Sequence, residues 1–281
     1  MYRNLLKTSV CTISFLVSLI ISMVLYGNNN TDLINTLLGV SSFIFGIFFT
    51  YFLGISSNKF TKITEALRKD DKTLLGIYYH SRSLKKEYQE KIKILLDDYL
   101  VNELDYFLVD YSKTGTKFFK LFEYCKTVDP IGFKEENAYE QIQDLLNEAL
   151  ENRKAVESQL SYQISIFEWF ALILFASVIV VCMFILSNGS IETSLMIATV
   201  SMGITAVLYL LYDIDNLQWK ETKLIWIPLT QLFKDMNLLP YFPKKVYQRI
   251  NLKLEKGKIR LATYPNAYPN FSKKAIEEIS I

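Results

Sequence analysis

Four apolar stretches, each free of charged residues, constrain the fold of this sequence more than any other feature. They cover residues 8–30, 33–58, 169–191 and 193–212. A helix needs about 20 such residues to cross the hydrocarbon core of a bilayer. In lipid the backbone must satisfy its own hydrogen bonds, and the stretches lack the strict alternation of barrel strands. The sequence therefore predicts four transmembrane helices, arranged as two hairpins.

The positions of lysine and arginine predict how these helices are oriented. Two basic residues precede the first stretch, 17 lie between residues 59 and 154, and 12 lie between residues 220 and 274. These are all 31 basic residues of the chain, so none falls in the connections at residues 27–32 and 187–192. Positive charge stays on the cytoplasmic side during insertion. We therefore expect a multi-pass protein of the cell membrane (inner or plasma membrane), with both termini and the middle of the chain in the cytoplasm.

The same pattern divides the chain into four regions. We expect a first transmembrane hairpin at residues 1–58, a cytoplasmic helical region at 59–165, a second hairpin at 166–212 and a cytoplasmic C-terminal region at 213–281. The chain has only 10 glycines and 6 prolines, so most of it should be helical. The predicted fold is an all-α membrane protein in which long helical extensions form a cytoplasmic layer.

Several segments of that layer have a predicted form. No glycine or proline occurs in residues 133–188, which predicts one helix that continues unbroken into the third span. The second span should continue as a helix through the one-sided apolar residues 60–67, and residues 83–111 should form an amphipathic helix. Residues 239–243 are expected to form a rigid turn, and the Tyr-Pro units within 264–270 predict an extended or disordered tail.

Residue usage argues against several classes of protein. The net charge of +2 is too small for a typical nucleic-acid-binding protein. The three cysteines, Cys11, Cys125 and Cys182, lack any close spacing, and His80 is the only histidine. A zinc site or a histidine-based catalytic triad would therefore depend on one residue. The sequence also lacks a phosphate-binding glycine loop. We expect no enzymatic activity, no cofactor and no bound metal.

The second span carries two ridges of side chains. Each ridge repeats every four residues, which places its members on one side of a helix. The small ridge consists of Ser42, Gly46, Thr50 and Gly54, and the bulky ridge consists of Phe43, Ile47, Tyr51 and Ile55. Small residues at this spacing allow helices to pack closely in lipid. The bulky ridge either faces lipid or a neighbouring span, or lines a conduit as a hydrophobic constriction that gates ions by dewetting.

Short motifs beside the second and fourth spans resemble a known family. Residues 51–58 read Tyr-Phe-Leu-Gly-Ile-Ser-Ser-Asn, a Glu-Ala-Leu-Arg element follows at 65–68, and residues 213–216 read Asp-Ile-Asp-Asn. Together they resemble the second-helix signature and the acidic-Asn element of bestrophins and bestrophin-like proteins. The positions that match the family motifs are Asn58, Glu65, Arg68, Asp213, Asp215 and Asn216.

The resemblance implies an ion channel built as a pentamer, with the second helix of each subunit lining one central pore. The three apolar positions of the family's hydrophobic neck fall on Ile47, Tyr51 and Ile55. It also implies anion conduction, which a ring of Lys59 and Lys62 below the neck would favour and nearby residue 65, a glutamate, would oppose. The implied partners are further copies of the chain, membrane lipids and small inorganic ions.

Departures from the family pattern make the chain a divergent member. Leu217-Gln218-Trp219 stands where the family usually has Pro-Phe-Gly, and no acidic cluster follows Asp215, so we expect no calcium gating. Two alternatives to a channel stay open. One is a membrane-anchored oligomeric scaffold or signalling protein that does not conduct. The other is a subunit of a proton-driven stator, which the absence of proline from the third and fourth spans disfavours.

Overall fold

The computed structural model describes six segments of the chain and divides into two compact units. The described residues are 2–24, 32–106, 110–217, 226–250, 257–264 and 274–280, with side chains from residue 9 onward except at residues 249 and 250. The membrane unit comprises residues 1–60 and 162–219, and the polar unit comprises residues 61–161 and 220–281.

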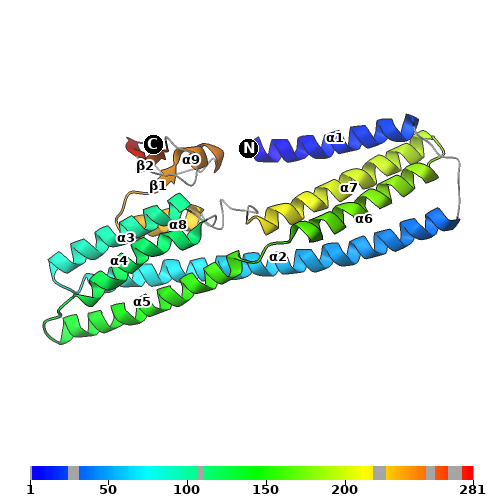
Figure 1. The fold of residues 1–281 in the computed structure, drawn as a ribbon. Coiled ribbons are helices and arrows are strands. Elements are labelled where there is room, and N and C mark those ends of the chain that lie inside the picture. Colours follow the sequence, from blue (N-terminus) through cyan, green and yellow to red (C-terminus); the bar gives the residue numbers. More distant parts are fainter. Residues whose placement is uncertain are drawn as a thin grey trace. The chain divides into compact units, whose positions relative to one another are not determined.

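The membrane unit is built from long apolar helices (Figure 1). They are α1 (Tyr2–Val24), the first part of α2 (Asp32–Ser81), α6 (Ile166–Leu186) and α7 (Ile191–Asp215). Among the described residues, α2, α6 and α7 are long and apolar enough to cross a membrane, with mean hydropathies of 1.9, 2.9 and 2.0 over their most apolar windows. The apolar part of α1 with described side chains, Ser9–Val24, is shorter. These helices are those of a membrane protein.

Helix α1 packs along α7 through hydroxyl side chains. Ser14 and Thr205 form a hydrogen bond of 2.9 Å between the two helices. Ser18 and Ser22 follow Ser14 at four-residue steps on α1 and are buried, and Ser201 on α7 is buried one turn from Thr205. Such small side chains let two helix backbones approach closely in lipid. A small-residue face was predicted on the second span only, and the face on α1 was not predicted.

The polar unit combines helices with a small sheet. Its elements are the rest of α2, α3 (Lys86–Tyr106), the 3-10 helix η2 (Tyr111–Thr114), α4 (Gly115–Lys126), α5 (Phe133–Leu160), α8 (Ile227–Asp235), β1 (Tyr241–Pro243), α9 (Lys244–Ile250), β2 (Lys258–Thr263) and β3 (Ala275–Ser280). Because α2 continues to Ser81, the expected extension of the second span is confirmed. Helix α3 confirms the helix expected within residues 83–111.

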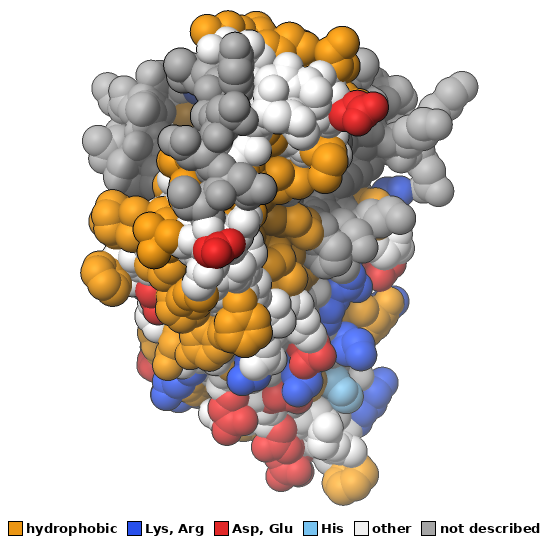
Figure 2. Space-filling model, turned by 90° about the vertical axis from the view of Figure 1, so that its right-hand side faces the viewer, with side chains coloured by type: hydrophobic (Ala, Val, Ile, Leu, Met, Phe, Trp, Pro, Cys, Tyr) orange, Lys and Arg blue, Asp and Glu red, His pale blue; other side chains and the backbone are white. Residues whose placement is uncertain are grey.

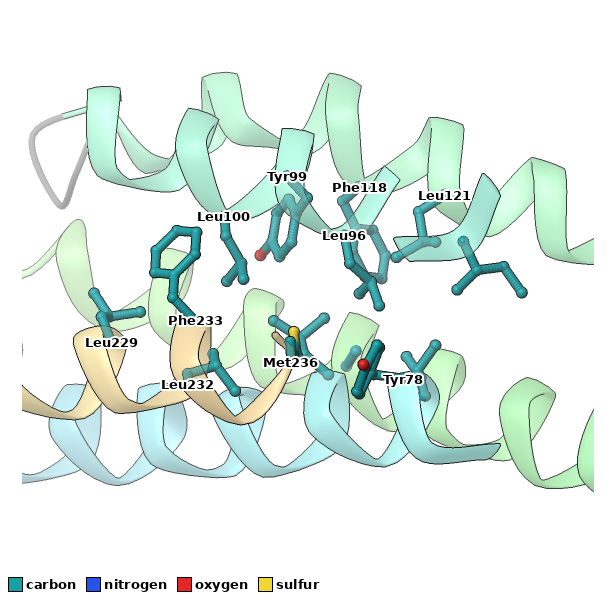
Figure 3. Close-up of a cluster of buried hydrophobic side chains, with 14 of the residues drawn as sticks. Tyr78, Leu96, Tyr99, Leu100, Phe118, Leu121, Leu229, Leu232, Phe233 and Met236 are labelled. Atoms are coloured by element: carbon teal, nitrogen blue, oxygen red, sulfur yellow. The ribbon is translucent and has the colours of Figure 1, made fainter. Parts of the chain in front are cut away.

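The hydrophobic core of the polar unit gathers side chains from α2, α3, α4 and α8 (Figure 3). Helix α3 contributes Leu96, Tyr99 and Leu100, which are fully buried, and these meet Phe118 of α4 and Phe233 of α8. The spacing of three and four residues on α3 is that of a helix with one face against a core. This core fixes the positions of the polar side chains beside it.

One predicted helix is broken in the structure. Residues 133–188 were expected to form a single helix, but α5 ends at Leu160 and α6 begins at Ile166. Ser165 caps α6, since its hydroxyl accepts a hydrogen bond from the backbone N–H of Glu168 and the Glu168 carboxylate accepts one from the backbone N–H of Ser165. This reciprocal capping box starts a new helix. The prediction of an unbroken helix was therefore wrong, although glycine and proline are absent.

The C-terminal region is not wholly helical. Strand β1 pairs with β2 in parallel, and β2 pairs with β3 in antiparallel, giving the order β1-β2-β3. The rigid turn expected at residues 239–243 is wrong for 241–243, because this segment forms β1. The prediction of an all-α fold thus holds for most of the chain but misses these short strands. Most of the Tyr-Pro segment, at residues 265–270, lies outside the described residues.

Candidate functional site

The bulky ridge of α2 is exposed along its length within the membrane unit. Phe43, Ile47, Tyr51 and Ile55 are exposed by 69%, 50%, 60% and 37%, respectively. Large apolar side chains at these positions face either lipid or a partner molecule. The structure therefore places the predicted neck residues together on one open face of one helix.

The small ridge beside it is equally open. A Cβ atom added at Gly46 or at Gly54 would meet nothing within 4 Å, and Ser42 is exposed. The hydroxyl of Thr50 donates to the carbonyl of Gly46 at 2.8 Å, so it is satisfied within its own helix. The surface along this ridge is consequently smooth and has room for another helix to approach.

Six residues of the two ridges form one shallow, open depression on α2. Its lining residues are Ser42, Phe43, Gly46, Ile47, Thr50 and Tyr51. In the space-filling view, hydrophobic side chains cover much of the visible surface of the membrane unit (Figure 2).

The opposite side of α2 is anchored inside the membrane unit. Phe52 is buried together with Leu172 of α6 and Leu211 of α7. The ring of Tyr51 stands edge-on to that of Phe52, with centroids 5.3 Å apart. This contact limits the orientations that Tyr51 can take on the open face. One side of α2 is therefore packed against α6 and α7 of the same chain, and the other side is open to lipid or to another molecule.

A buried ion pair lies at the end of the membrane unit's part of α2. The ammonium of Lys59 donates to the backbone carbonyl of Asp215 at 2.9 Å and lies 3.5 Å from its carboxylate. The hydroxyl of Ser56 donates to the same carboxylate at 3.4 Å. Lys59 and Asp215 are both more than nine-tenths buried. The expectation that Lys59 lines a pore below the neck is therefore wrong, because its ammonium is buried in an ion pair with Asp215.

The other motif positions are divided between the two units. Asn58 is exposed on α2, as are residues 65 and 68 on the part of α2 in the polar unit. Asp213 is buried in the membrane unit. Asn216 caps the C-terminal end of α7, where its side-chain amide donates to the carbonyl of Tyr212 at 2.9 Å. Within the membrane unit, Asp215 is the motif residue that forms the ion pair with Lys59.

A family model described as the bestrophin-like domain matches residues 9–217, which is well over half of the chain. The chain belongs to the bestrophin-like family. No curated protein and no solved structure matches it. Membership of the bestrophin-like family indicates a channel-type function in general. The match ends at Leu217, so α8, α9 and the sheet lie beyond the bestrophin-like domain.

The structure gives a reason for one departure from the bestrophin-like pattern. Leu217 occupies the position at which the family usually has proline, and its backbone has φ of 56°. The proline ring fixes φ near −65°, so proline could not adopt this left-handed conformation. Proline at position 217 would therefore require a different backbone in the turn after α7.

Proposed function

We propose that this bestrophin-like protein forms a homo-oligomeric ion channel, a pentamer, in which the α2 helices surround a central pore. The observation that carries the proposal is the open apolar face of α2, which its own membrane unit leaves uncovered. A ring of identical subunits is a closed arrangement that would cover such a face on every copy. The proposal rests on this face together with membership of the family.

The pore neck would consist of Ile47, Tyr51 and Ile55. Two four-residue steps along a helix cover about 12 Å, so rings of these residues would form a short apolar constriction. A narrow apolar channel expels water and blocks ions until it widens. The hydroxyl of Tyr51 would make the middle of this neck less apolar than a purely aliphatic one.

The proposed permeating ions are small inorganic anions. This preference follows from the family resemblance, with support from Lys62, which is exposed on α2. Lys59 contributes nothing to it, because its charge is paired inside the membrane unit. The exposed carboxylate of Glu65 would oppose it. The reversal potential in a chloride gradient decides between anion and cation conduction.

The proposed topology has four spans, with α1 as the first, in the cell membrane and with both termini in the cytoplasm. The complete absence of lysine and arginine from residues 27–32 and 187–192 supports this orientation. The polar unit would then lie in the cytoplasm. We propose no enzymatic activity, no cofactor and no nucleic-acid partner.

The test of conduction is a comparison of currents in planar bilayers. Purified parent protein should give single-channel currents. The open probability of the double variant Ile47→Ala/Tyr51→Ala should be at least about tenfold higher than that of the parent. The wider, less apolar neck would lose its dewetted state. A matched control is Phe170→Ala on α6, whose side chain is exposed by 60%, as is that of Tyr51. This control should behave as the parent does.

A non-conducting scaffold is the second candidate function. The specific observation in its favour is the open small ridge, because Gly46 and Gly54 offer a surface for close helix packing without any pore. The same recordings separate the two candidates. If neither the parent nor the widened variant passes current in bilayers that contain folded oligomer, the scaffold replaces the channel.

A further inference from the structure

A buried cation, Arg153 of α5, organises a polar cluster within the polar unit. Its side chain is only 2% exposed. The guanidinium donates to the Tyr99 hydroxyl at 3.1 Å, to the Thr114 hydroxyl at 2.6 Å and to the Glu157 carboxylate at 3.1 Å. It also lies over the aromatic ring of Tyr111, 4.8 Å from the centroid. Three elements, α3, η2 and α5, thus meet at this one charge.

Two buried carboxyl groups lie close enough to this cation for their charges to interact with it. Asp70 of α2 is 1% exposed and Glu103 of α3 is 6% exposed. One oxygen of Asp70 accepts a hydrogen bond from the Tyr99 hydroxyl at 3.3 Å. Its other oxygen, Oδ1, is buried and has no hydrogen-bond partner among the described residues. The guanidinium of Arg153 is hydrogen-bonded elsewhere, so the Asp70 carboxyl is left half satisfied.

The surrounding charges leave this cluster with an excess of acid. The charged and titratable groups that act on Asp70 and Glu103 come from four elements. They are Asp71 on α2, Tyr99 on α3, Tyr111 on η2 and Arg153 on α5. Burial raises the pKa of Asp71 itself to about 7, against the charge of Arg68, and Glu157 pairs with Arg153. Two buried carboxylates with one shared cation would repel each other at high cost in a medium of low dielectric constant.

Burial and this repulsion both favour the protonated acid. Burial raises the pKa of Asp70 from 3.8 to about 7, the charge of Asp71 adds to the rise, and Arg153 and the Tyr99 hydroxyl oppose it. Burial likewise raises the pKa of Glu103, again with help from Asp70 and Asp71 and against Arg153. Because the two carboxyls act on each other, they titrate as a pair.

We propose that the pair of Asp70 and Glu103 is a proton-binding site, and that release of its proton loosens the packing of α2 against α3 and α5. In the protonated state the pair carries one negative charge opposite Arg153. Release of the proton to solvent adds a second negative charge around an Asp70 oxygen that has no donor. This proposal concerns the polar unit and does not depend on whether the oligomer conducts.

The stability of the polar unit should fall as the pH rises and this proton is released. The folded state binds the proton more tightly than the unfolded state, whose aspartate has the ordinary pKa of 3.8. Stability from this site is therefore fully present below about pH 4 and is lost as the pH rises to about 7. Between about pH 5 and pH 8 the parent's unfolding temperature should fall by about 5 °C.

The test uses the full chain in detergent and reads protonation directly. An infrared titration of the parent should show the C=O stretch of a protonated buried carboxyl that disappears with a midpoint near neutral pH. Asp70→Asn, which imitates the protonated acid in shape and charge, should lose the part of this titrating band that Asp70 contributes and much of the pH dependence of the unfolding temperature. Burial also raises the pKa of the neighbouring Asp71 to about 7, so a smaller titrating band from Asp71 should remain. The control is Asp98→Asn on α3, whose side chain is half exposed, and it should keep both.

Clear outcomes would overturn the proposal. One is a parent protein without any titrating protonated band, which needs no variant to fold. Another is a band that persists unchanged in both Asp70→Asn and Glu103→Gln. A third is unfolding that responds to sodium or potassium but not to pH, since a metal cation would then balance the charge in place of the proton.

Discussion

Replacement of Arg153 by methionine should lower the free energy of unfolding of the polar unit by about 3–5 kcal/mol, the usual cost of removing one partner from a buried charge pair. Methionine fills much of the same space but leaves Asp70 and Glu103 without a cation. Because Arg153 lowers the pKa of Asp70, its removal should raise that pKa further. The loss of stability should thus be larger at pH 8 than at pH 5. Thermal unfolding of the purified protein at both pH values measures it.

The neighbouring residue supplies the control. Lys154 is exposed on the same helix, so Lys154→Met should change stability by less than about 0.5 kcal/mol. If Arg153→Met were no less stable than Lys154→Met, the cluster would not be organised around its cation. The rings of Tyr99, Tyr111 and Phe118 would then hold these elements together on their own.

Asp215→Ala should be nearly as damaging in the membrane unit, with a loss of about 3–5 kcal/mol. The substitution leaves the ammonium of Lys59 buried, with the backbone carbonyl of residue 215 as its remaining partner. Without the carboxylate, the free-energy cost of burying the Lys59 charge is no longer offset by the ion pair. The yield and thermal stability of the detergent-solubilised protein measure the effect.

A double variant separates the ion pair from the space it fills. Lys59→Met/Asp215→Leu removes both charges and should recover most of the stability lost in Asp215→Ala, since buried ion pairs are often replaceable by apolar residues. Lys62→Met, at an exposed position one turn away, should have little effect on stability. If the double variant were as unstable as Asp215→Ala, an unpaired buried charge would not explain the instability of Asp215→Ala.

Much of the membrane unit could be predicted from local pattern. The four-residue repeats of α2 placed Ile47, Tyr51 and Ile55 on one face, and the structure presents that face as open. The break before α6 was equally local, because Ser165 and Glu168 stand three residues apart immediately before an apolar run. The absence of glycine and proline from residues 133–188 removes the usual helix breakers but does not cancel this start signal. The three-residue spacing of Ser165 and Glu168 therefore predicts the start of α6 better than the lack of glycine and proline predicts a continuous helix.

The two charge clusters were harder to predict, for different reasons. Lys59 and Asp215 are 156 residues apart, and their pairing depends on how α2 packs against the end of α7. No local spacing encodes that contact. Arg153 did carry a signal, because it lies between Ala149 and Val156 on the buried side of α5. A charged residue within an apolar stripe predicts a buried partner for that charge. The spacing does not show which residue the partner is.

The sheet was missed because its strands are short and pair across distant segments. Strand β1 has three residues and includes Pro243, which made a turn the natural prediction. It pairs with β2 only because the chain returns to it after α9. Such parallel pairing is a tertiary contact and leaves little trace in local sequence.

A single-particle structure of the protein purified from membranes is the most direct test of the proposed pore. We expect a ring of five identical subunits with the side chains of Ile47, Tyr51 and Ile55 directed at the central axis. This expectation would be contradicted by a particle in which this face of α2 points outward to lipid, or in which α2 lies away from the axis.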